Sequence, residues 1–283
     1  MFGFLNVYKP QGKTSHDVVA ILRRITKVKQ IGHTGTLDPF AEGVLPVCIG
    51  RSTRLIEYLD DEKAYVGTIQ FGKSTTTYDI EGEVVNISDK KVDFSNVETA
   101  LMQFQGEIQQ LPPIYSAIKV NGKKLYEYAR NGETVEIKPR TVIISRLELV
   151  GFDFEAQTAK VLIECSKGTY IRSIAHDLGE ALGCYGHLVK LVRTKAGKFN
   201  LDTSVKLEEL NDVIQVQENL LNPLEYLNYQ KCEISDLEKD KVSHGMGLSK
   251  DLPNGIVILT SENNLVAIAN VEEKKVKVLK VFI

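Results

Sequence analysis

The chain has 283 residues, 43% of them hydrophobic and 25% charged, and a formal net charge of −2, which argues against a strongly basic nucleic-acid binder. Its length suits one large domain, alone or with a small appendage, and its composition is ordinary for a globular protein. No apolar run approaches the roughly 20 residues of a membrane-spanning helix and residues 1–10 do not resemble a signal peptide, so we expect a cytoplasmic protein that does not bind membranes.

Hydrophobic periodicity, capping residues and turn residues predict a series of elements along the chain. They are a helix over 17–29 with Ser15 as its N-cap, a loop over 32–43, a strand over 44–49, a short helix capped by Ser52 or Thr53 and ending at Leu59, a strand over 63–71, a helix with the capping box Ser95 to Glu98, a loop-rich stretch over 111–140, strands over 140–154 and 159–165, and a helix over 171–182 closed by Gly183.

The last stretch, residues 232–283, predicts strands near 255–260, 265–270 and 276–282, and we expect a small all-β appendage there. Along the whole chain, strands and helices mix without a strict βαβ alternation. This pattern favours an α+β sheet over a doubly wound parallel sheet.

The sequence offers no sign of a metal or a cofactor. Its four cysteines and five histidines are scattered, and no CxxC pair is present. A zinc site would need clustered ligands. The chain also lacks a GxGxxG fingerprint after a predicted strand and a GxxxxGK(S/T) loop, which argues against nucleotide cofactors.

Charge is unevenly distributed along the chain. Residues 119–146 hold seven Lys or Arg against three Glu, and residues 186–198 hold four Lys or Arg and no acid. Residues 201–240 hold ten acids against three Lys. This asymmetry can give a neutral protein a basic face for nucleic acid, although solvated surface charge is an equally good reading of any one segment.

The glycine-rich loop at residues 32–43 is the most informative segment. Pro39 restrains the backbone and pushes Asp38 toward an extended conformation. A carboxylate on a stiff loop between two packed elements suits a nucleophile, which gains from a fixed attacking geometry. Taken alone, an Asp-Pro pair is more often only a turn.

Residues 166–179 follow a predicted strand and open a helix. Arg172 falls in the first turn, where a cation opposes the helix dipole. We expect a carboxylate such as Asp38 as its partner, with a surface arginine beside a neighbouring acid as the alternative. Tyr65 and Tyr170 could stack on a base or simply fill the core, and His33 could stack, bond the loop or act as a base.

Five segments together resemble the TruB family of bacterial pseudouridine synthases. They are residues 6–15, 32–46, 63–65, 110–119 and 168–172, in the family's order, and the resemblance covers most of residues 3–200. It implies the pseudouridine synthase fold, with a mixed, mainly antiparallel central sheet flanked by helices and loops. It also implies a catalytic domain over 1–230 with an RNA-gripping insert at about 111–140, and a small PUA-like, β-rich module over 231–283.

The resemblance also implies the site residues. Asp38 matches the family's catalytic aspartate, Tyr65 its active-site tyrosine and Arg172 the partner of the nucleophile. The expected substrate-binding residues are His33, Tyr170, Leu191, Arg54 and Lys9. Arg54 stands where the family has a lysine, and Val192 stands where it often has an arginine, so two RNA contacts differ from the family pattern.

The implied activity is isomerisation of uridine 55 in the T-loop of tRNA, by an Asp nucleophile and base flipping, with no metal and no cofactor. We expect the partner to be the tRNA T-arm stem-loop, with a monomeric enzyme and no obligatory protein partner. Three alternatives stay open: a guide-RNA-dependent relative, a tRNA-folding chaperone, and an unrelated hydrolase with an Asp nucleophile. A hydrolase would need a second acid or a metal, and Glu42 is the only nearby acid.

Overall fold

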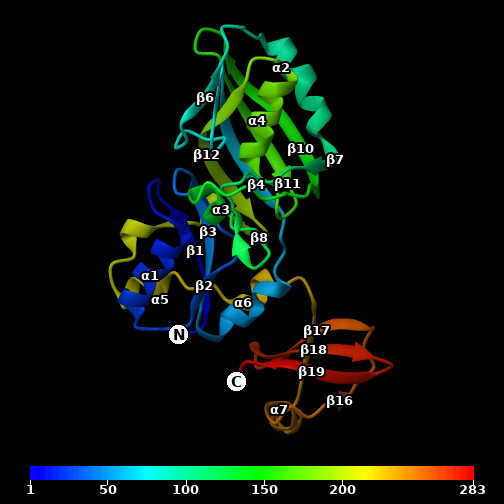
Figure 1. Ribbon diagram of the computed structural model, residues 1–283. Helices are drawn as coiled ribbons and strands as arrows, with labels where there is room; N and C mark the ends of the chain where they lie inside the picture. Colours follow the sequence, from blue (N-terminus) through cyan, green and yellow to red (C-terminus); the bar gives the residue numbers. More distant parts are fainter.

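The computed structural model describes all 283 residues and contains a ten-stranded sheet, a five-stranded sheet and two short hairpins. The large sheet has the order β14-β1-β3-β12-β4-β11-β10-β7, with β2 beside β3 and β13 beside β12. Its strands are β1 (Gly3–Lys9), β2 (Ile31–His33), β3 (Glu42–Ile49), β4 (Lys63–Phe71), β7 (Gly106–Gln110), β10 (Arg140–Asp153), β11 (Thr158–Cys165), β12 (Gly186–Ala196), β13 (Phe199–Asn200) and β14 (Val205–Lys206). Only β1–β14 and β3–β12 pair in parallel, so the predicted mixed, mainly antiparallel α+β sheet is confirmed (Figure 1).

The large sheet consists of two halves that meet at a short seam. β3 and β12 pair only through Glu42 with Val192 and Gly43 with Arg193. On one side of this seam, α1 (Ser15–Thr26) packs on β1 and β3. On the other, α2 (Phe94–Leu101) and α4 (Ile171–Ala181) pack on the half that contains β4, β11 and β10. Figure 1 shows the two halves one above the other, so the loop before β3 lies where they join.

Helix starts differ from the expected positions by one or two residues. The N-cap of α1 is Thr14, whose side chain accepts a bond from the Asp17 amide in a capping box, and Ser15 is the first helical residue. The N-cap of α2 is Asp93, paired with Asn96, rather than Ser95. In both cases a neighbouring residue that also makes a good cap takes the extended conformation. The expected short helix is the 3-10 helix η1 (Gly50–Tyr58), which has no side-chain cap.

Two long strands were not expected from the sequence. β1 is buried along almost its whole length, so it lacks the polar–apolar alternation by which a half-buried strand is recognised. β12 carries Lys190, Arg193 and Lys195, which resembled a basic surface segment. Both are inner strands of the sheet, paired on both sides. The basic side chains of β12 fit there because their polar ends reach partners or solvent while their stems stay packed.

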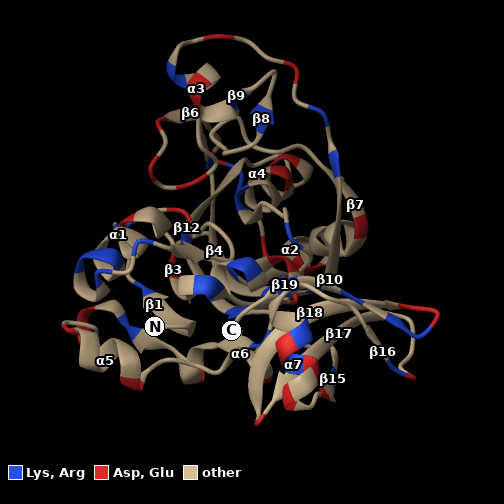
Figure 2. Ribbon diagram, turned by 90° about the horizontal axis from the view of Figure 1, so that it is seen from below, with Lys and Arg blue, Asp and Glu red and all other residues tan.

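The remaining elements of the first 230 residues are short. They are the hairpins β5 (Lys73–Thr75) with β6 (Val84–Ile87) and β8 (Lys119–Val120) with β9 (Lys123–Lys124), the helices α3 (Leu125–Arg130), α5 (Val213–Glu218) and α6 (Pro223–Tyr226), and the 3-10 turns η2 (Met102–Phe104), η3 (Leu201–Thr203) and η4 (Leu207–Glu209). The insert at 111–140 is thus mostly loop, with one hairpin and one helix. Figure 2 shows Lys and Arg positions, in blue, along the ribbon of β8 and beside α3.

The C-terminal residues form a separate sheet of order β15-β17-β18-β19-β16. Its elements are β15 (Gln230–Glu233), α7 (Asp236–Ser243), β16 (Leu248–Ser249), β17 (Gly255–Ser261), β18 (Asn264–Glu272) and β19 (Lys275–Val281). The module is β-rich, but the expectation of an all-β unit is wrong, because Ser235 caps the helix α7. Ile258, Ile268 and Phe282 share a core with Phe4 and Leu55, so the module packs on η1 and β1. None of the helices of the protein has both the length and the apolar character of a membrane crossing.

Candidate active site

Asp38 lies on the loop of residues 34–41, between β2 and β3, which we call the Asp38 loop. Ser15 at the start of α1 fixes this loop, because its hydroxyl donates to the Leu37 carbonyl at 3.1 Å and accepts from the Leu37 amide at 2.8 Å. Leu37 and Phe40 are buried next to Tyr65, in the core of the half that contains β4, β10 and β11. The loop is therefore tied to both halves of the sheet.

Arg193 on β12 supports the Asp38 loop from within the protein. Its side chain is completely buried. Nε donates to the Val44 carbonyl at 2.7 Å, Nη2 to the Gly35 carbonyl at 3.1 Å and Nη1 to the Thr36 carbonyl at 3.3 Å. A buried charge is costly unless its donors are satisfied, and here the backbone of the loop and of β3 satisfies them.

Gly43 permits the close approach of β3 to Arg193. Its φ is +108°, and a Cβ atom there would lie 2.3 Å from the Arg193 carbonyl oxygen. A side chain is therefore excluded both by the backbone conformation and by space. Gly43 thus allows β3 and β12 to meet at the seam.

Lys9 lies under the loop. Its ammonium is fully buried and donates to the carbonyls of Lys13 at 2.6 Å, Pro10 at 2.9 Å and Pro39 at 3.3 Å. Burial lowers the pKa of Lys9 to about 8, although the negative charge of Asp38 opposes this shift. Lys9 was expected to bind substrate directly, but its ammonium donates to three backbone carbonyls and so supports the residue after Asp38.

Arg172, in the first turn of α4, meets Asp38 across the seam. Nε lies 2.9 Å from Oδ2 of Asp38, and Nη2 donates to Oδ1 at 3.4 Å. The Nε–H bond is not directed at an acceptor, so the shorter contact is ionic. Nη1 donates to the Thr77 carbonyl and Nη2 to the Tyr115 carbonyl, both at 3.1 Å. The guanidinium is thus held on three sides, while 33% of the Asp38 side chain stays exposed.

A second carboxylate, Asp79, was not singled out from the sequence. Its Oδ2 lies 3.4 Å from Nη1 of Arg172, and its side chain is 4% exposed. Oδ1 accepts from the Thr77 hydroxyl at 2.5 Å and from the Glu81 amide at 3.0 Å. The turn that carries it lies between β5 and β6, and the only signal in the sequence is an acid three residues before Gly82, which fits many turns.

The electrostatics of the site follow from this packing. Burial raises the pKa of Asp38, the adjacent Arg172 opposes the shift, and the negative charge of Asp79 adds to it. Burial also raises the pKa of Tyr65, while the positive charge of Arg193 opposes that shift. The phenol of Tyr65 is therefore the favoured form, next to a buried cation that would stabilise its anion.

Three more of the predicted residues lie in or beside the same region. Tyr65 on β4 pairs in register with Arg193, and Leu191 on β12 is 4% exposed in the core that holds Leu37, Phe40 and Tyr65. Tyr170 precedes α4, and its backbone is clamped by Gln110, which accepts from the Tyr170 amide at 2.7 Å and donates to its carbonyl at 2.9 Å.

His33 and Arg54 are placed differently. His33 on β2 is half-buried, its Nδ1 has no partner, and its ring lies edge-on to His16 at 6.1 Å between centroids. Arg54 on η1 points to the C-terminal module, where Nη1 donates to the Val281 carbonyl at 2.9 Å and the guanidinium lies 5.5 Å from the Phe282 ring centroid. The structure does not bring Arg54 to Asp38.

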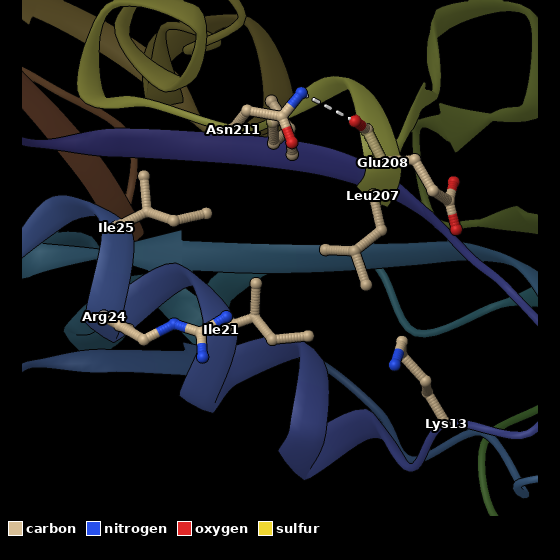
Figure 3. A pocket seen from close by; sticks show the side chains of 8 residues that line it. Lys13, Ile21, Arg24, Ile25, Leu207, Glu208 and Asn211 are labelled. Atoms are coloured by element: carbon tan, nitrogen blue, oxygen red, sulfur yellow. Dashed lines mark hydrogen bonds between the residues drawn. The ribbon is translucent and has the colours of Figure 1, made fainter.

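A separate pocket of about 430 Å³ lies between α1 and the turn η4. Figure 3 shows Ile21, Ile25 and Leu207 lining it, with Lys13 and Arg24 at its sides. It contains none of the predicted site residues. No group of three or more His, Cys, Asp and Glu side chains in the protein is arranged to hold a metal ion.

Two family models match the chain. The TruB family pseudouridylate synthase N-terminal domain matches residues 23–171, and the tRNA pseudouridylate synthase B C-terminal domain matches residues 172–228. Together they span the Asp38 loop, α4 and β12. The boundary between the two matches falls just before Arg172, so Asp38 lies in the first matched domain and Arg172 in the second.

Relatives are similar along their whole length. Proteins named tRNA pseudouridine synthase B from Clostridium acetobutylicum and Caldanaerobacter subterraneus subsp. tengcongensis are 37% and 40% identical to this chain, with 99% of each chain covered. The solved structure of a Cbf5-Nop10-Gar1 complex superimposes with a TM-score of 0.75 at 26% identity, covering 100% of this chain and 85% of that chain. The matched domains, the relatives and the shared fold together show that the chain belongs to the TruB family of pseudouridylate synthases.

Proposed function

We propose that this protein isomerises uridine 55 in the T-loop of tRNA to pseudouridine, with Asp38 as the nucleophile. The observation that carries the proposal is the ion pair of Asp38 with Arg172, at 2.9 Å, in which the Asp38 side chain stays partly exposed. Relatives that bear the name tRNA pseudouridine synthase B support the class of substrate. Membership of the family supports the class of reaction.

The reaction rearranges bonds within one nucleotide. The bond between ribose C1′ and uracil N1 breaks, a bond between C1′ and C5 forms, C5 loses a proton and N1 gains one. The balance needs no oxidant, reductant or metal, so we propose that no cofactor takes part. Asp38 attacks the nucleotide or stabilises the charge at C1′, and Arg172 holds the carboxylate in position by charge and by hydrogen bonding.

We propose that Tyr65 and Leu191, in the core beside the Asp38 loop, form the pocket for a base that has left its stack. Extrusion costs a few kcal/mol, and stacking on an aromatic ring returns roughly 1–3 kcal/mol per base. Tyr65 would stack on the uracil and remove the C5 proton, directly or by positioning another base, and Leu191 would close the pocket. His33 would occupy the space that the flipped uridine leaves, and Tyr170 would line the opening.

The insert is the proposed grip on the T-arm stem-loop. Its cations lie over aromatic rings: Lys123 Nζ is 4.6 Å from the Tyr128 ring centroid, and Lys124 Nζ and the Arg130 guanidinium are each 5.3 Å from that of Tyr126. Such pairs present charge to phosphates and flat faces to bases. Lys9 would act indirectly, by holding the Asp38 loop, and Arg54 would reach RNA only near the C-terminal module.

We further propose a cytoplasmic, monomeric enzyme that needs no partner protein. The structural neighbour in the Cbf5-Nop10-Gar1 complex is assembled with other proteins, which keeps a guide-dependent relative as the second candidate. Incubation of the pure protein with an unmodified T-arm stem-loop separates the two. Pseudouridine at position 55, mapped by chemical modification and reverse transcription, is the expected result, and its absence without added RNA and proteins would favour the alternative.

A further inference from the structure

Tyr78 and His176 form a stacked pair next to the ion pair. Their ring centroids are 3.9 Å apart and the planes differ by 8°. Tyr78 lies in the turn between β5 and β6, and His176 lies on α4. Both side chains are half-buried, and Nδ1 of His176 is buried without a hydrogen-bond partner. The face of the imidazole is therefore its main contact with the turn.

The pair extends the contacts that the turn makes with Arg172. Arg172 and His176 are four residues apart on α4, so they lie on the same face of the helix. Thr77, before Tyr78, accepts from Nη1 of Arg172 at 3.1 Å, and Asp79, after it, places Oδ2 3.4 Å from the same nitrogen. Three consecutive residues of the turn thus run along one face of α4.

Tyr78 has a backbone conformation that bulky residues rarely adopt. Its φ is +64°, in the left-handed region, and such a residue persists only where its surroundings hold it. The Tyr78 carbonyl accepts from the Leu188 amide at 3.0 Å, and the Ile80 amide donates to the Leu188 carbonyl at 3.0 Å. The bend at Tyr78 allows the residues on both sides of it to reach one guanidinium.

We infer that Tyr78 and His176 are positioning residues for the proposed reaction: their stacking holds the bend that keeps Thr77 and Asp79 on Arg172. The inference rests on the proposed function, in which Arg172 orients Asp38. Neither side chain is a hydrogen-bond or ionic partner of Asp38 or Asp79, so the pair acts through the turn. When the stack is lost, Arg172 loses its fixed partners on one side, and the direction in which it holds Asp38 becomes variable.

The first test compares variants that remove a ring with variants that keep one. The loss of an aromatic pair removes enough free energy to change a rate or an equilibrium constant about three- to tenfold. We expect Tyr78→Ala and His176→Ala to lower kcat by that amount, with the KM and Kd for tRNA within about twofold of the native values. Tyr78→Phe and His176→Phe should retain the native rate. His176 is half-buried on a helix, so its alanine variant is expected to fold, as thermal unfolding will show.

The second test asks whether the effect passes through Asp79. In an Asp79→Asn background, adding Tyr78→Ala should cause little further loss, because the group that the turn positions has already been changed. Tyr185→Ala is the matched control, since Tyr185 is also half-buried and left-handed, with a φ of +59°, but follows the far end of α4. It should leave kcat unchanged.

Hydrogen exchange of the amides of Tyr78 and Ile80 gives a measurement that does not depend on activity. Both amides are bonded within the turn or to β12 and should exchange faster in Tyr78→Ala and His176→Ala. Native rates and native exchange in both alanine variants would overturn the inference, as would losses that add fully to that of Asp79→Asn. If the native protein made no pseudouridine, the proposed function would fail, while exchange would still test the pair.

Discussion

Arg172 and Asp38 are 134 positions apart in the chain, yet Nε of one lies 2.9 Å from Oδ2 of the other. Arg172 belongs to α4, on the half of the sheet that contains β4, β10 and β11. Asp38 belongs to the loop before β3, on the other half. The same guanidinium also faces Asp79 at 3.4 Å. Arg172 thus lies between two carboxylates and orients both, and of the two only Asp38 is partly exposed.

Replacing Asp38 with Asn keeps the shape of the side chain and removes its charge. We expect pseudouridine formation to fall by about a thousandfold or more, because the nucleophile is lost. Arg172 keeps Asp79 as its partner, so the fold should survive. The measurement is single-turnover formation of pseudouridine in transcribed tRNA, with tRNA affinity as the control. Substantial product would contradict the assignment. If this variant still promotes tRNA folding as well as the native protein does, the protein has a chaperone role beside catalysis.

Arg172→Lys keeps the charge but replaces the planar fork with a single ammonium. A lysine cannot satisfy Asp38, Asp79 and the carbonyls of Thr77 and Tyr115 together. We expect a loss of about a hundredfold in kcat, with tRNA binding within a few-fold of the native value. Steady-state kinetics and filter binding will measure the two effects separately. Native kinetics would show that the ion pair does not orient the nucleophile.

The rate should fall as the pH falls through the pKa of Asp38. Burial raises this pKa, so Asp38 becomes protonated at a pH above the ordinary pKa of an aspartate, about 3.9. A raised pKa also means that the folded state favours the protonated form, so this group stabilises the fold as the pH falls. Activity should therefore decline before unfolding does, as single-turnover rates and circular dichroism across the same pH range will show. Rate loss that coincides with unfolding would argue against this order.

Gly43→Ala should destabilise the protein strongly. The added Cβ would lie 2.3 Å from the Arg193 carbonyl oxygen at a φ of +108°, and we expect a loss of about 2 kcal/mol or more in the free energy of unfolding. The control is Gly122→Ala on the β8–β9 hairpin, where φ is +82° but nothing lies within 4 Å. That variant should lose only about 1 kcal/mol. Urea denaturation measures both, and equal losses would show that space at the seam is not limiting.

Binding of tRNA should weaken steeply as salt increases, because cations of the insert are expected to contact phosphates. Lys123→Ala should reduce the slope of log affinity against log salt by about one. Tyr128→Ala, which removes the ring beneath that ammonium, should weaken binding with little change of slope. A flat salt response of the native protein would remove the proposed grip.

Much of the fold was predictable because it depends on local chemistry. β4, β10, β11 and α4 carry clear periodicity and lie within one or two residues of the expected bounds. β1 was missed because a strand that is buried on both faces need not alternate, and β12 because its charges resembled a surface segment. The helix α7 was missed because its apolar face is minimal, with Val242 its one buried residue.

The placement of the proposed site residues was predictable where a sequence motif contains them. Asp38, Arg172, Tyr65 and Leu191 lie together, and their motifs gave each a role. Asp79 could not be found in this way, since its role depends on a turn that meets α4 only after folding. Lys9 and Arg193 are basic residues that bind backbone carbonyls inside the protein, and a sequence does not separate such residues from surface charges.

The seam between β3 and β12 has only two residue pairs, yet the proposed nucleophile comes from one side of it and the guanidinium from the other. The proposed catalysis therefore requires that the two halves of the sheet are docked correctly at this seam. Substitutions along this narrow joint should alter turnover without touching RNA, because they change how the two sides of the seam meet.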